Sequence, residues 1–96
     1  MKLVLRPFVQ RDLDEAARWY EEQQPGLRET FLRAVEDTLY RIEANPHLYP
    51  AVRPNVRRAA LRRFPYGVYY RLVNDEIQVL AVVHDARNPS VWQRRH

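Results

Sequence analysis

The spacing of apolar residues changes from a helical to a strand period near the middle of this 96-residue chain. Between residues 10 and 44 apolar side chains recur every three or four positions, whereas beyond residue 50 they alternate or run together. A repeat of about 3.6 belongs to helices and a repeat of 2 belongs to strands. Pro46 and Pro50 lie between the two patterns. We therefore expect helices before this segment and a sheet after it.

Two amphipathic helices are expected in the first pattern. The first helix runs from about Gln10 to Gln24, and the second from Leu27 to about Asn45, where the following proline ends it. Because the break at Pro25-Gly26 is short, the two helices are predicted to form an antiparallel hairpin. The apolar stripes consist of Leu13, Ala16, Ala17 and Tyr20 in the first helix, and of Leu27, Phe31, Val35, Leu39 and Ile42 in the second.

The polar and aromatic residues of the helices carry two separate expectations. Asp12 is predicted to lie in the first turns, where a carboxylate interacts favourably with the helix dipole. Trp19 and its neighbour Tyr20, together with Tyr40 of the second helix, are interpreted as core residues. Since Trp19 lies off the apolar stripe, the alternative is that it covers the edge of the hairpin or a partner surface.

The strand pattern predicts a small antiparallel sheet. The last strand, Glu76–His84, is apolar on both faces, with Ile77, Val79, Ala81 and Val83 on one and Leu80 and Val82 on the other, so it is expected to be central. The other strands are predicted at Lys2–Arg6, Val52–Val56, Ala59–Phe64 and Val68–Val73, with a turn at Asn74-Asp75. The expected fold is α+β: an N-terminal strand, a helical hairpin and a three- to four-stranded antiparallel sheet (β-α-α-β-β-β), forming one domain over residues 1–96.

The charge is distributed unevenly between the two halves of the chain. Residues 1–48 hold 7 basic and 9 acidic side chains, a net charge of −2, whereas residues 49–96 hold 9 arginines and 3 acids, a net charge of +6. Arginines beside tyrosines on a sheet can bind phosphates and stack on bases, or can bind an acidic partner. The alternative is a solvated basic face.

Several functional classes are disfavoured by what the sequence lacks. There is no cysteine, and the histidines at positions 47, 84 and 96 are not at metal-ligand spacing, so no metal site is expected. The only glycines, Gly26 and Gly67, do not form a phosphate-binding loop, and no cofactor is expected. Since no apolar run approaches the length of a membrane span, a cytoplasmic protein without membrane contact is predicted.

One group near the end of the chain could carry chemistry. It consists of His84, Arg87, Trp92 and Arg94. A histidine can act as a general acid or base, and a nearby guanidinium can stabilise charge on a scissile phosphate, as in metal-free RNA cleavage. The alternative is that His84 is a strand-end residue bonded to a backbone carbonyl.

The sequence resembles the RelE/ParE toxin superfamily over nearly its whole length. The matching segments are Asp12-Leu13-Asp14-Glu15-Ala16, Trp19-Tyr20-Glu21, Pro25-Gly26-Leu27, Phe31, Ile42, Asn45-Pro46, Tyr49-Pro50, Arg62 to Arg71, Ile77 to His84, Arg87-Asn88-Pro89 and Trp92. The resemblance implies a toxin of a type II toxin–antitoxin pair of the plasmid-stabilisation kind. It also implies a cognate antitoxin that wraps the toxin in a hetero-oligomer.

The superfamily divides by target, and the resemblance implies a choice between two branches. The RelE-like branch cleaves mRNA on the ribosome, and the ParE-like branch inhibits DNA gyrase. Gly67 stands where the nuclease branch usually carries an arginine, although Arg58, Arg63 or Arg71 could compensate. The leading hypothesis is therefore a ParE-like gyrase inhibitor. The alternatives are a RelE-like endoribonuclease and an antitoxin-binding module without toxic activity.

Each hypothesis assigns residues. If the chain is a nuclease, His84 is the acid or base, and Arg63 and Arg87 stabilise the phosphate. The residues expected to contact the target or the antitoxin are Arg57, Arg58, Arg62, Arg63, Tyr70, Arg71, Arg87, Trp92 and Arg94.

Overall fold

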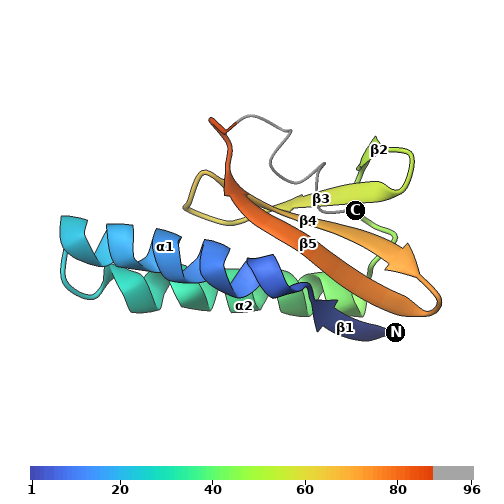
Figure 1. Cartoon of the computed structure of the whole chain (residues 1–96), viewed down its shortest axis with the longest axis horizontal. Coiled ribbons are helices and arrows are strands. Elements are labelled where there is room, and N and C mark those ends of the chain that lie inside the picture. Colours follow the sequence, from blue (N-terminus) through green and yellow to red (C-terminus); the bar gives the residue numbers. More distant parts are fainter. Residues whose placement is uncertain (88–96) are drawn as a thin grey trace.

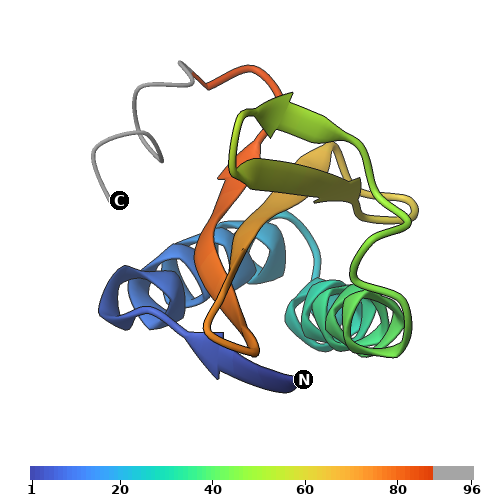
Figure 2. The same ribbon diagram turned by 90° about the vertical axis from the view of Figure 1, so that its right-hand side faces the viewer.

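The computed structural model describes residues 1–87 and confirms the α+β class. Two helices, α1 (Pro7–Gln23) and α2 (Leu27–Ala44), lie side by side against one face of a five-stranded sheet (Figures 1 and 2). The strands are β1 (Lys2–Leu5), β2 (Ala51–Arg53), β3 (Val56–Ala60), β4 (Tyr66–Val73) and β5 (Glu76–His84), in the order β1-β5-β4-β3-β2.

The sheet is mixed rather than antiparallel throughout. Strands β2 to β5 pair in antiparallel fashion as predicted, whereas β1 pairs with β5 in parallel, with Leu5 opposite Val79. Strand β1 ends at Leu5. Helix α1 begins at Pro7, three residues before the predicted start at Gln10. Proline suits the first helical position because the N–H it lacks would have no partner there. Two strands that pair in parallel cannot be joined by a tight turn, and here α1, α2 and the strands β2 to β4 separate β1 from β5 along the chain.

The helical hairpin has the predicted antiparallel form. Gly26, with φ of 96°, precedes α2 in the left-handed conformation that favours glycine. The Glu21 carboxylate of α1 accepts hydrogen bonds from the backbone N–H groups of Gly26 and Arg28, at 3.1 Å each to Oε1. A side chain from one helix thus satisfies N–H groups at the beginning of the next.

Two strand boundaries differ from the prediction. The segment predicted as Val52–Val56 is a hairpin, because Pro54 and Asn55 form the turn between β2 and β3. The segment predicted as Ala59–Phe64 ends as a strand at Ala60 and continues as a loop in which Arg63 has φ of 71°. The turn at Asn74-Asp75 is confirmed, and both residues have positive φ, as a two-residue hairpin turn of type I′ requires.

A β-bulge in β5 changes the predicted faces of that strand. Tyr69 pairs with Ala81 but the next residue, Tyr70, pairs with Val79, so β5 has one residue more than β4 at Leu80. Beyond the bulge the alternation is inverted. The core that contacts the helices therefore contains Ile77, Val79 and Val82, whereas Ala81 and Val83 join Leu80 and Val56 in a second cluster on the other face of the sheet. The prediction that Ala81 and Val83 share a face with Val79 was wrong because a strict period of 2 does not allow for the bulge.

Candidate functional site

A groove of about 570 Å³ lies between α1 and the adjoining ends of β4 and β5. Its lining is mostly apolar and aromatic, with a few polar groups, which is the composition of a surface that binds a protein segment or small molecule. The lining residues are Asp12, Glu15, Ala16, Trp19, Tyr20, Pro65, Tyr66, Val82, Val83, His84, Ala86 and Arg87. We refer to it as the α1–β5 groove.

Aromatic rings form one wall of the α1–β5 groove. The Trp19 side chain is 54% exposed and contacts Tyr20 edge to face, with ring centroids 5.0 Å apart. Tyr20 in turn packs against Phe31, Phe64 and Tyr66. Tyr20 thus joins the core as predicted, whereas the core interpretation of Trp19 was wrong and its alternative, a surface position at the hairpin edge, is correct. Exposed tryptophan in a groove is a frequent anchor for a partner.

His84 and Arg87 lie at the end of the groove where β5 stops. The Nδ1 atom of His84 accepts a hydrogen bond from the Ala86 backbone N–H at 3.0 Å, and the ring contacts Tyr66 edge to face at 5.1 Å. His84 is therefore bonded to the backbone as the structural alternative expected, but as an acceptor rather than a donor. Burial raises the pKa of the Tyr66 hydroxyl, while the charge of Arg87 opposes this shift.

Two of the three residues assigned to a nuclease line the α1–β5 groove, and the third does not. His84 and Arg87 line the α1–β5 groove, but Arg63 does not; it is exposed in the loop between β3 and β4. The same groove is lined by the carboxylic residues Asp12 and Glu15. Carboxylates repel a phosphate, so this lining favours a protein ligand over RNA.

The remaining arginines divide between the two faces of the sheet. Arg57 donates from Nη1 to the carbonyl oxygens of His47 and Tyr49, at 3.1 and 2.6 Å, and so holds the segment before β2. Arg71 donates from Nε to Oε1 of Gln78 at 2.8 Å on the face away from the helices. Arg62 is exposed in the loop beside Arg63. The arginines expected to make one contact surface therefore do not share one face.

Tyr70 does not fit its predicted role as a contact residue. Its side chain is fully buried, and its hydroxyl donates to the carbonyl oxygen of Pro46 at 2.6 Å. Burial raises the pKa of this hydroxyl to about 12, against an opposing effect of Arg57. Two other predicted contact residues, Trp92 and Arg94, lie outside the described residues.

Arg58 occupies the space beside Gly67. A Cβ atom added at Gly67 would lie 2.5 Å from Arg58 Nε and 3.0 Å from its Cζ. The guanidinium forms an ion pair with Asp85, with Nη2 2.5 Å from Oδ1, and lies 6.0 Å from the centre of the Tyr69 ring. The glycine thus makes room for an arginine from the neighbouring strand, and this arginine already has a carboxylate partner.

Sequence reasoning missed the role of Asp12. Since α1 begins at Pro7, Asp12 is beyond the first turn, and its side chain is buried at 9% exposure. Its Oδ2 atom accepts a hydrogen bond from the Val82 backbone N–H at 3.0 Å, beside the bulge in β5. Its position three residues after Val9 and four before Ala16 places it on the buried stripe, and this was the signal available in the sequence.

The part of the chain that the structure describes contains no group of three or more metal-ligating side chains. Neither α1 nor α2 is long and apolar enough to cross a membrane.

The chain as a whole resembles known proteins. Residues 3–89 match the family model of the ParE toxin of the type II toxin–antitoxin system parDE. The chain belongs to the ParE toxin family. Toxin ParE2 of Mycobacterium tuberculosis, from strains CDC 1551 and H37Rv alike, is 31% identical over 83 residues, which cover 85% of this chain and 79% of the relative.

A solved structure supports the assignment. A chain of the chromosomal ParDE toxin–antitoxin system from P. aeruginosa superposes with a TM-score of 0.68 at 26% identity, covering 88% of this chain and 95% of that one. This ParE-family chain is the toxin of a parDE type II system, which implies a cognate ParD antitoxin. The predicted superfamily and the toxin–antitoxin role are confirmed.

Proposed function

We propose that this ParE toxin arrests growth by inhibiting DNA gyrase in the cytoplasm, and that it does not cleave RNA. The observation that carries the proposal is the lining of the α1–β5 groove, compared with the three residues that the nuclease hypothesis assigns. Of the three, only His84 and Arg87 line the α1–β5 groove, and the groove also presents two carboxylic residues. A phosphate in this groove would meet negative charge without the second guanidinium that the cleavage hypothesis requires.

The surroundings of Gly67 support the same choice. Arg58 fills the space beside this glycine, but Asp85 neutralises it at 2.5 Å. An arginine held in an ion pair must lose that partner before it can bind a phosphate, which costs free energy. Arg58 is therefore a poor substitute for the arginine that the nuclease branch carries at this position.

The α1–β5 groove is proposed as the surface that the antitoxin covers. The exposed Trp19 ring would anchor an apolar side chain, and Arg87 would pair with an acidic group at the other end. Toxin and antitoxin would then form a hetero-oligomer in which the groove is blocked. Trp19→Ala and Arg87→Glu should each weaken binding of purified antitoxin in calorimetry, whereas Leu48→Ala, at an exposed apolar residue outside the groove, should not.

The proposed target is tested with purified components. The toxin should inhibit supercoiling by purified gyrase, and addition of antitoxin should relieve the inhibition. Primer extension on transcripts from induced cells should show no new 5′ ends. Codon-linked cleavage of mRNA together with unaffected supercoiling would overturn the proposal.

The second candidate is the endoribonuclease, and it is favoured by one observation: His84, Tyr66 and Arg87 lie together in the groove. The third is a binding module without toxicity. Growth of induced cells without antitoxin separates this candidate from the other two, since only the module leaves growth unchanged.

A further inference from the structure

The outward face of α2 is a second candidate interface, on the side of the helical hairpin away from the sheet core. The buried residues of α2 are Phe31, Val35, Thr38 and Ile42. The opposite side of the helix is exposed to solvent. We define the outward face by Glu29, Arg33, Glu36, Tyr40 and Glu43. Tyr40 is 76% exposed, the largest exposed fraction among the large hydrophobic side chains of the described residues, so its interpretation as a core residue was wrong.

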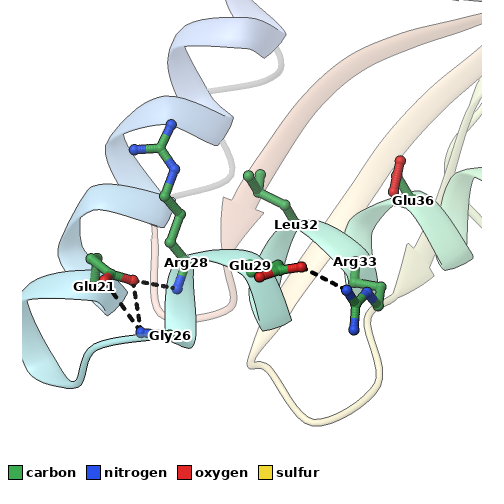
Figure 3. Close-up of a pocket in the computed structure, with 7 residues that line it drawn as sticks. All are labelled: Glu21, Gly26, Arg28, Glu29, Leu32, Arg33 and Glu36. Carbon is green, nitrogen blue, oxygen red and sulfur yellow. Dashed lines mark hydrogen bonds and ion pairs between the residues drawn. The ribbon is translucent and has the colours of Figure 1, made fainter.

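Two shallow hollows lie along this face and meet at its centre. The first, near the beginning of α2, is shown in Figure 3, where Leu32 forms an apolar part of the lining beside Arg28 and Glu29. The second includes Tyr40 and Glu43 in its lining and extends to Leu3 of β1. Both hollows are lined by Arg33 and Glu36. The face therefore combines an exposed aromatic side chain, Tyr40, with a hollow beside Leu32.

Charge is distributed along α2 in a self-complementary way. The first half of the helix carries Arg28 and Arg33 with a single acid, Glu29, whereas the second half is mainly acidic. The acidic residues of that half are Glu36, Asp37 and Glu43, of which Asp37 is paired with Arg41 at 3.3 Å. If two copies of α2 pack in antiparallel fashion, the basic half of each lies against the acidic half of the other.

We propose that the outward face of α2 binds the same face of a second copy of this chain, with the two helices antiparallel about a two-fold axis between residues 34 and 35. This register places Arg33 opposite Glu36 of the second copy. It also places Tyr40 opposite Glu29, so that the ring enters the hollow beside Leu32. In a two-fold interface every contact occurs twice, so a substitution that removes one ion pair from each copy removes two from the dimer.

The residues involved are free to make these contacts. Arg33 forms an ion pair with Glu29 at 2.7 Å, but the two side chains are 74% and 76% exposed, so this pair contributes little to stability. The guanidinium can therefore turn to Glu36 of the second copy at small cost. The first hollow keeps its shape meanwhile, because the Glu21 carboxylate holds the N–H groups of Gly26 and Arg28 (Figure 3).

Sedimentation equilibrium of the purified full chain tests this proposal. The wild-type chain should dimerise with increasing concentration. Arg33→Glu should raise the dissociation constant by at least about tenfold, since it sets two carboxylates against each other twice. The double variant R33E/E36R restores opposite charges and should recover most of the affinity. Arg18→Glu, an exposed arginine of α1, is the matched control and should leave the affinity unchanged.

A cross-linking experiment tests the antiparallel register. Because the chain has no cysteine, disulfides can form only at the introduced cysteines. Glu29→Cys and Tyr40→Cys are prepared as separate variants and oxidised alone and as a mixture. Disulfide-linked dimers should form mainly in the mixture, because Glu29 faces Tyr40 across the axis. Circular dichroism checks that each variant is folded.

Two results would overturn the proposal. One is a wild-type chain that remains monomeric over the whole concentration range. The other is cross-linking of each cysteine variant to itself as efficiently as in the mixture, which would mean parallel helices. Neither result bears on antitoxin binding, since that function is assigned to the α1–β5 groove.

Discussion

The Oδ2 atom of Asp12 lies 3.0 Å from the backbone nitrogen of Val82 and accepts its hydrogen bond. The two residues are 70 positions apart in the chain, and the bond joins the middle of α1 to β5 just beyond the bulge at Leu80. Both residues line the α1–β5 groove. This contact therefore fixes the position of α1 relative to β5, and with it the width of the groove.

Replacement of Asp12 by alanine should destabilise the chain. The Val82 N–H would then be buried without this acceptor, and an unsatisfied buried donor costs about 1–3 kcal/mol. Urea denaturation measures the change in the free energy of unfolding. Asp14→Ala is the control, because Asp14 is exposed and accepts a hydrogen bond from the nearby Gln10 side chain at 3.0 Å. Equal stability of the two variants would contradict the assigned role of Asp12.

Gly67→Ala should be costly only while Arg58 is present. The added methyl group would lie 2.5 Å from Arg58 Nε and would displace the guanidinium from Asp85. We expect a loss of about 0.5–1 kcal/mol in the free energy of unfolding, because the displaced group is a flexible side chain and the lost ion pair is partly exposed. In an Arg58→Ala background the same substitution should cost almost nothing. A double-mutant cycle by chemical denaturation measures this coupling, and additive effects would refute it.

The stability of the chain should fall between about pH 10 and pH 12. Burial raises the pKa of Tyr70 to about 12 from its ordinary value of 10.0. The folded chain therefore keeps a proton that the unfolded chain loses first. The stabilisation is complete below the unfolded pKa and is lost as the pH rises through the folded one. Tyr70→Phe should show a smaller fall over this range, measured as the denaturant midpoint against pH. The fall should not vanish, since burial also raises the pKa of Tyr20 and Tyr66.

Arg87→Ala should reduce toxicity while the chain remains folded. Arg87 is exposed at the end of the groove, so its loss removes a charge without opening the core. Arg63→Ala is expected to act in the same direction if the exposed β3–β4 loop also contacts the target. Growth of induced cells and thermal unfolding of the purified variants are the two measurements. Full toxicity in both folded variants would exclude a contribution of these arginines.

Val79→Asp should unfold the chain. Val79 is fully buried in β5 and lies between Leu5 of β1 and Tyr70 of β4. A carboxylate there would be desolvated among apolar neighbours, at a cost of about 3 kcal/mol or more, which is a large part of the stability of a domain this small. Val73→Asp, on a partly exposed strand end, is the milder control. A cooperative unfolding transition in Val79→Asp close to that of the wild type would contradict this placement.

The local elements of this protein could be predicted from the sequence because their causes are local. The stripe from Leu13 to Tyr20, the break at Gly26 and the turn at Asn74-Asp75 each follow from the periodicity or from the backbone preferences of a few adjacent residues. The antiparallel pairing of β2 to β5 follows in the same way, since short connections join neighbouring strands. The family resemblance also depended on linear motifs, and the family comparison confirmed it.

The details of the site depended on contacts between distant parts of the chain, and only the tertiary structure shows them. The bulge at Leu80 moved Val82 to the helix side of the sheet, where its N–H found Asp12. Gly67 was read as the absence of an arginine, yet its neighbour in space, Arg58, fills that volume from another strand. Tyr70 was predicted to be a contact residue, but it is buried and its hydroxyl bonds to Pro46, which is 24 positions away in the chain. Periodicity predicts which residues of a strand or helix share a face. It does not predict where a bulge shifts the register of a strand, or which residue of another element contacts a given side chain.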